Sequence, residues 1–131
     1  MAVDESGLNQ AGVESAINNV IDGGATIHLL TSQAEFTDDA TDLEGKSDAQ
    51  ETVDESDFTI NFGASFSDTS EVELVNDVEF GPLDIGTVFN VAVIGSGDNA
   101  FVGIEENEPE LTGEDFTIPA GETVYEIGNV L

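Results

Sequence analysis

The feature that most constrains this chain is its charge balance. The sequence holds 29 Asp and Glu residues against one basic residue, Lys46, and its formal net charge is -28 over 131 residues. Small soluble domains work well with a net charge of about 2–8, and self-repulsion beyond that destabilises a compact state in dilute buffer. At about 1 M salt the Debye length falls to about 3 Å, which screens most of that repulsion. We therefore expect a halophile's protein that folds in very salty water.

The apolar content of the chain argues against intrinsic disorder. Leu, Ile, Val and Phe together make up about 29% of the residues, above the roughly 20% that marks disordered chains. The length suits one domain spanning residues 1–131. There is no Cys, which rules out a disulfide framework and a thiolate zinc site.

The same composition excludes several classes of partner. One Lys cannot neutralise a phosphate backbone, so nucleic acid is not expected as a partner, and an anionic membrane surface is excluded for the same reason. The sequence has no run of 18 apolar residues. The first ten residues, MAVDESGLNQ, are acidic where a secretion signal is basic, so we expect no such signal.

Residues 8–22 have the periodicity of an amphipathic helix. Apolar side chains recur on one face, namely Val13, Ile17, Val20 and Ile21. Asp4 and Ser6 are candidate N-cap residues, and the glycine pair that starts at Gly23 is expected to end the helix. Residues 25–30 (ATIHLL) are then predicted as the first strand.

Beyond residue 57 the pattern is that of β-strands. Apolar and polar residues alternate in several short runs, and the predicted segments are 58–62, 72–74, 78–80, a central strand at 87–94, a hairpin turn at 95–99, its return strand at 100–104, a strand at 116–118 and a last one at 123–131. One helix followed by seven or eight short strands predicts a mainly β fold: an antiparallel, jelly-roll-like β-sandwich preceded by an N-terminal α-helix.

Two stretches are rich in acid and poor in apolar residues. Residues 32–57 are predicted to form a long acidic surface loop with room for a short strand or turn, and residues 105–115 a second one. Loops of such length in a small domain are either functional or solvated excursions. Lys46 lies in the first loop, where we expect it to be a local charge partner.

No catalytic constellation stands out. Close carboxylate pairs carry little information in a chain with 29 acids, and a glycosidase needs two at a set separation. His28 lies in an apolar strand, where it is either a general base or a packed side chain; there is no second His and no Cys. The glycine-rich residues 95–97 lie between two strands and are too short for a dinucleotide fingerprint. We expect no enzyme, no catalytic residues and no cofactor.

A calcium site is the metal alternative to weigh. Asp38, Asp39 and Asp42 lie close together, and Asp98 and Asn99 occupy a glycine-rich turn. Hard cations take such oxygen ligands, but the EF-hand pattern is absent. Loose condensation of cations explains acidic loops equally well, so no defined metal site is expected.

The order of the segments resembles a family of small virion proteins of tailed bacteriophages, labelled tail fibre or head decoration proteins. The residues that carry the resemblance follow the N-terminal helix, namely 27–31 (IHLLT), 58–63 (FTINFG), 75–80 (VNDVEF), 86–94 (GTVFNVAVI), 95–104 (GSGDNAFVGI) and 118–125 (IPAGETVY). The chain departs from that pattern at Ile85, where the family has an aromatic residue, and at Asn90 and Val91, which replace His-Phe. The family offers no catalytic residues to carry over.

Charge and resemblance together favour a non-enzymatic structural protein on the surface of a haloarchaeal tailed virus. The expected form is a head decoration or turret component that is assembled in the host cytoplasm and then exposed to the hypersaline medium. Its expected partners are further copies of itself, as a trimer or pentamer, and other virion proteins such as the major capsid protein. The alternatives are a tail-fibre or baseplate module, or a carbohydrate-binding β-sandwich of a halophile.

Overall fold

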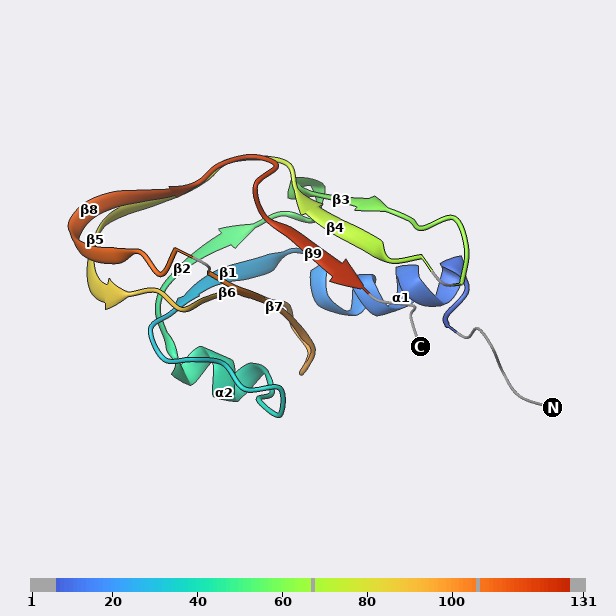
Figure 1. Cartoon of the computed structure of the whole chain (residues 1–131), viewed down its shortest axis with the longest axis horizontal. Helices are drawn as coiled ribbons and strands as arrows, with labels where there is room; N and C mark the ends of the chain where they lie inside the picture. The colour runs from blue at the N-terminus through green and yellow to red at the C-terminus, as the bar shows by residue number, and fades with distance from the viewer. Residues whose placement is uncertain (1–6, 67, 106, 128–131) are drawn as a thin grey trace.

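The described part of the chain folds into antiparallel sheets with two α-helices (Figure 1). The computed structural model describes residues 7–66, 68–105 and 107–127. The helical elements are α1 (Gln10–Ile21), α2 (Ala40–Gly45) and the 3-10 turn η1 (Glu55–Asp57). The strands are β1 (Ala25–Leu30), β2 (Ser47–Val53), β3 (Phe58–Asn61), β4 (Ser70–Leu74), β5 (Val78–Thr87), β6 (Asn90–Ile94), β7 (Ala100–Ile104), β8 (Glu110–Ile118) and β9 (Val124–Ile127).

The described strands form three sheets, ordered β2-β1-β6-β7, β3-β4-β9 and β5-β8. Strands distant in the sequence are neighbours, since β1 pairs with β6 and β4 with β9. The predicted class, a mainly β and sandwich-like fold with an N-terminal helix, is confirmed.

Helix α1 buries the predicted face and ends where the sequence indicates. Its four buried residues are Val13, Ile17, Val20 and Ile21. The helix begins at Gln10, two residues later than predicted, because the side chain of Asn9 caps it by accepting from the Gly12 N–H at 2.9 Å. The candidate caps Asp4 and Ser6 lie outside the described residues. Gly23 and Gly24 have φ of +79° and +100°, a conformation that glycine adopts without steric cost.

The two inner strands of the four-stranded sheet, β1 and β6, carry apolar side chains on both faces, and both faces are packed against other parts of the chain. Ile27 and Leu29 of β1 lie in the main core, whereas Leu30 packs in a second cluster with Ala40 and Leu43 of α2. All five residues of β6 are buried. The prediction of a central strand is therefore confirmed for residues 90–94, while Thr87 belongs to β5.

The main core joins α1 to all three sheets. From the three-stranded sheet it receives Val72 and the ring of Tyr125. That ring stacks on Phe101 of β7 with 5.5 Å between centroids, and its hydroxyl donates to the Val91 carbonyl at 3.0 Å. The tyrosine therefore links β9 to both β6 and β7, and its burial raises the pKa of the Tyr125 phenol.

The prediction of an acidic loop at 105–115 is wrong for its second half. Residues 110–118 form β8, which pairs with β5 over its whole length, and both strands arch away from the other sheets (Figure 1). Strand β5 continues past Pro82 to Thr87. Its pairing with β8 is irregular on both sides of Pro82, and a proline is tolerated in a strand where its missing N–H is not needed for pairing. Phe80 and Phe116 pack across the ribbon, 6.0 Å between centroids.

The prediction of a loop at 32–57 is also wrong for most of that stretch. It contains α2, the seven-residue β2 and η1. Strand β2 is an edge strand on β1, and its side chains are mostly solvent-exposed with only Val53 buried. A strand whose partner supplies the pairing needs little apolar content of its own, so the acidic composition did not prevent it from forming.

Candidate interaction surface

The single histidine lies inside the four-stranded sheet rather than in an open site. His28 is 4% exposed on β1, and its Nδ1 lies 2.8 Å from Ser47 Oγ of β2. The Ser47 hydroxyl donates to the Ala49 carbonyl at 3.0 Å. Because that hydroxyl carries one hydrogen, Nδ1–H is the donor toward Ser47 Oγ. In this tautomer the imidazole does not accept the serine proton, so the pair is arranged as a structural contact between β1 and β2.

The surroundings of His28 favour its neutral form. Burial lowers the pKa of His28 below 6.5, and the negative charge of Glu44 opposes part of that effect. A shallow depression of about 450 Å³ lies beside the histidine and is lined by Glu44, Asp48 and Gln50. The open side of this depression is thus acidic.

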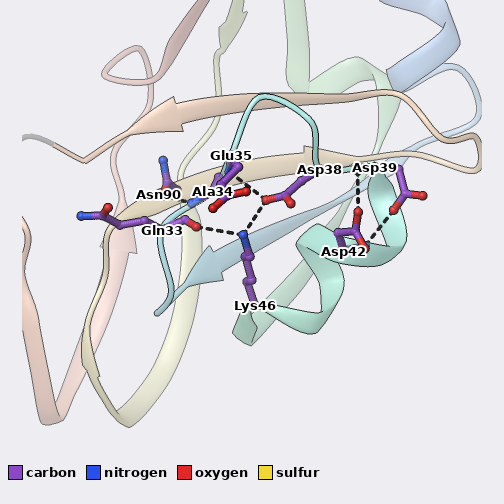
Figure 2. A network of polar contacts seen from close by, with 8 residues as sticks. All are labelled: Gln33, Ala34, Glu35, Asp38, Asp39, Asp42, Lys46 and Asn90. Atoms are coloured by element: carbon purple, nitrogen blue, oxygen red, sulfur yellow. Dashed lines mark hydrogen bonds and ion pairs between the residues drawn. The ribbon is translucent and has the colours of Figure 1, made fainter.

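Three of the carboxylates considered as calcium ligands, those of Asp38, Asp39 and Asp42, are engaged with the protein. Asp39 accepts from the Asp42 N–H at 2.9 Å and Asp42 accepts from the Asp39 N–H at 3.2 Å, which makes a reciprocal cap on α2 (Figure 2). From Asp98 it is the backbone carbonyl, rather than the carboxylate, that accepts from the Ala40 N–H, at 3.3 Å. Among the described residues no group of three His, Cys, Asp or Glu side chains could hold a metal ion.

Lys46 is a local charge partner, as predicted. Its Nζ lies 2.7 Å from Asp38 Oδ2 and donates to the Gln33 carbonyl at 3.0 Å (Figure 2). The hydrogen bond between the two side chains lowers the pKa of Asp38 and raises that of Lys46. The Lys46 and Asp38 side chains are 24% and 10% exposed, and an isolated ion pair that water reaches contributes little stability. The consequence of this contact is therefore positional: it fixes the segment before α2.

That segment, residues 31–39, is here named the Phe36 loop. The Ala34 N–H donates to Asn90 Oδ1 at 2.9 Å, and Asn90 Nδ2 donates to the Gly103 carbonyl at 3.1 Å. Asn90 is one of three buried polar side chains among the described residues. The loop is therefore tied to β6 and β7 at one end.

A tight turn ties the other end of the Phe36 loop. The Glu35 N–H donates to Asp38 Oδ2 at 2.8 Å, and the Asp38 N–H donates to the Glu35 carbonyl at 3.0 Å. Between these fixed points the side chain of Phe36 is fully exposed. A hydrophobic ring held in solvent by an ordered loop loses little conformational entropy when a partner covers it.

A second exposed apolar feature lies on the edge strand β7. Val102 is 41% exposed and Ile104 is 83% exposed, and among the described strands β7 pairs only with β6. Unpaired strand edges invite pairing with another chain unless they are covered. The apolar residues of β7 and the Phe36 loop therefore mark surfaces that a partner could cover.

Comparison of the chain with protein-family models, curated proteins and solved structures found no match. Within the part of the chain that the structure describes, no helix is long and apolar enough to cross a membrane.

Sequence reasoning missed Phe36 as a surface residue. Its ring is fully exposed, and Phe62 and Phe66 are exposed as well. The alternation of apolar residues from Phe58 to Phe62 placed Phe62 on the buried face of its strand, whereas its side chain is exposed. The one usable signal for Phe36 was its position: it is the only large apolar residue between Thr31 and Leu43, where no neighbour supplies a helical or strand period that could bury it.

Proposed function

We propose that this chain is a non-enzymatic structural protein of the virion surface of a tailed virus that infects halophilic archaea. Within the virion it acts as a head decoration or turret component that assembles with copies of itself and contacts the major capsid protein. The proposal rests on three supports: the acidic surface, the resemblance of the segment order to small virion proteins, and exposed apolar features that suit assembly.

The distribution of charge is the observation that carries the proposal. Among the described residues no carboxylate is buried, and the buried polar side chains are His28, Ser70 and Asn90. The acids therefore form a shell around an apolar core. Such a shell repels itself in dilute buffer and is screened in brine, and a virion surface is in permanent contact with the external brine.

The Phe36 loop supports an assembly role. Aromatic side chains at the centre of an interface supply much of its binding free energy, and the chain uses its single Lys to hold this loop in place. Most soluble oligomers are symmetric assemblies of identical copies, and such an assembly would cover the exposed ring.

Purification of virus particles tests this function. Intact virions and tail-less heads are isolated in molar salt, and the chain is quantified by mass spectrometry relative to the major capsid protein. The proposal expects the chain in both fractions at a fixed stoichiometry. Its presence in intact virions but not in tail-less heads would favour the tail-fibre or baseplate alternative, and its absence from both would overturn the proposal.

A carbohydrate-binding module of a halophile is the second candidate. Its support is that Phe62 and Phe66 are exposed beside one groove, and exposed aromatic rings can stack on sugars. Glycan binding in molar salt that is lost in Phe66→Ala and retained in Val124→Ala would favour this candidate.

A further inference from the structure

An apolar groove lies where the start of α1 meets the connection between β3 and β4. Its volume is about 410 Å³. The apolar side chains that line it include Leu8, Val13, Phe62, Ala64 and Phe66. Leu8 is 49% and Phe66 53% exposed, so the lining is partly accessible to solvent. An engineered apolar cavity of about 150 Å³ is sufficient to bind benzene, and this groove can therefore accept a phenyl ring.

The groove differs in charge from the rest of the surface. None of its lining side chains is ionisable, and the first turn of the 12-residue α1 holds no acidic residue. The positive end of the helix dipole lies there. A carboxylate nearby, that of Asp68, accepts from the Ala64 N–H at 2.9 Å. In a chain of net charge -28, the groove therefore has an uncharged lining with one carboxylate, that of Asp68, beside it.

The Phe36 loop has the complementary properties. Its exposed ring is flanked by Glu35, Asp38 and Asp39, and Asp38 and the turn around it are fixed by hydrogen bonds (Figure 2). Because Asp38 is paired with Lys46, the negative charges beside the ring are those of Glu35 and Asp39. An aromatic side chain with this acidic rim matches an apolar groove that has no ionisable lining residue and a positive helix end. Both features belong to the same chain.

We propose that the Phe36 loop of one copy inserts its ring into the groove of the next copy. The loop lies beside α2 at the lower side of the view in Figure 1, whereas the groove lies at the right-hand end, between the start of α1 and the β3–β4 connection. The loop and the groove are thus different surfaces of the molecule. The contact is therefore head-to-tail. Contacts of this kind close into rings or continue as filaments. The inference rests on the self-assembly part of the proposed function and names its contact.

Self-association of the purified full-length chain tests the proposal. Sedimentation velocity is measured in about 3 M NaCl, where screening removes repulsion between copies, for the wild-type chain, Phe36→Ala, Ala64→Trp and Val124→Ala. Removing the central aromatic is expected to weaken association by about 30-fold or more, and filling the groove with Trp by a similar factor. The control, Val124→Ala, changes a partly exposed apolar residue outside the loop and the groove and should associate as the wild-type chain does.

A mixture of the two defective variants gives the sharpest result. Phe36→Ala retains the groove and Ala64→Trp retains the ring, so an equimolar mixture should form one-to-one dimers that grow no further. A wild-type chain that stays monomeric, or a Phe36→Ala variant that associates as wild type, would overturn the proposal. The proposal would also be overturned if Ala64→Trp, measured by itself, associates as strongly as the wild-type chain. That result would place the contact between copies outside the groove.

A terminal segment of the same chain is the rival occupant of the groove. A chain lacking residues 128–131, which include Val130 and Leu131, should associate as the wild type does if a second copy fills the groove. Association that appears only after this deletion would overturn the proposal. Detection of the chain in virions is independent of these results. The proposed function can therefore hold when this contact is absent, and the contact can exist when the chain is absent from virions.

Discussion

Gly95 is the residue whose replacement tests the packing of α1 most severely. It follows β6, and a Cβ atom built there would lie 1.9 Å from the carbonyl oxygen of Val20 and 2.9 Å from its carbonyl carbon. These are backbone atoms of α1, so no side-chain rotation relieves the overlap. In Gly95→Ala the last turn of α1 must move away from β6, which disturbs the buried residues Val20 and Ile21.

The expected loss for Gly95→Ala is about 3 kcal/mol in the free energy of unfolding, the upper part of the range for overpacked cores. For a chain of 131 residues this corresponds to a fall in Tm of roughly 10 °C. Circular dichroism melting measures this fall in Tm. The melting is done in molar NaCl, where salt screens the repulsion between the carboxylates.

Gly97→Ala is the matched control on the same turn. The nearest atom to its added Cβ is the Asn19 carbonyl oxygen at 3.9 Å, an ordinary contact. Replacing a glycine whose backbone suits alanine stabilises by about 0.4–1 kcal/mol through the unfolded chain, so Tm should stay level or rise. A Gly95→Ala protein that melts within ~2 °C of the wild type would refute the close seating of α1 on β6, since roughly 10 °C is expected from that contact.

Three further predictions follow from buried groups and from charge. Tyr125→Phe keeps the stacked ring but loses the hydrogen bond to Val91; urea unfolding in molar NaCl should show a loss of about 1 kcal/mol, and no loss would contradict that bond. Burial lowers the pKa of His28, so on acidification the imidazole is protonated more readily in the unfolded chain than in the folded one. The free energy of unfolding should therefore decline as the pH falls below 6.5. His28→Gln should lack that decline down to about pH 5, and the same pH dependence of stability in both proteins would contradict the burial of His28. The Tm of the wild-type chain should rise steeply between ~0.1 M and molar NaCl, whereas a salt-independent Tm would contradict screening of the -28 charge.

The elements that sequence predicted well are those with strong local signals. The face of α1 is set by four apolar residues at helical spacing, and its end by Gly23 and Gly24. Strand β6 and its hairpin with β7 are marked by an apolar run and a glycine-rich turn. In these places local composition and tertiary burial agree, so periodicity was sufficient.

The elements that sequence missed form through partners that composition does not reveal. Helix α2 is only six residues long, too short for a periodic pattern, and depends on the reciprocal cap of Asp39 and Asp42 and on burial of Leu43. The spacing of those two acids was the available signal. Strands β5 and β8 contain Pro82, Gly86 and Gly113, which argue against strands, yet each pairs with the other.

The candidate surface could be predicted only in part. The charge partner expected for Lys46 exists in Asp38. The isolation of Phe36 among polar residues was a signal for its exposure. The fixed conformation of its loop was not predictable, because it depends on hydrogen bonds with Asn90 and Lys46, which lie far along the chain or beyond α2. The groove likewise joins α1 to the β3–β4 connection, which only the tertiary fold brings together.

The central claim is that this acidic chain is a component of the outer virion surface. Immunogold labelling of intact virions in hypersaline medium, with an antibody raised against the folded chain, measures this directly. The account predicts gold particles on the outer surface of the heads and loss of label after competition with the purified chain. Virions that carry no label, while the same antibody labels the host cell, would contradict it.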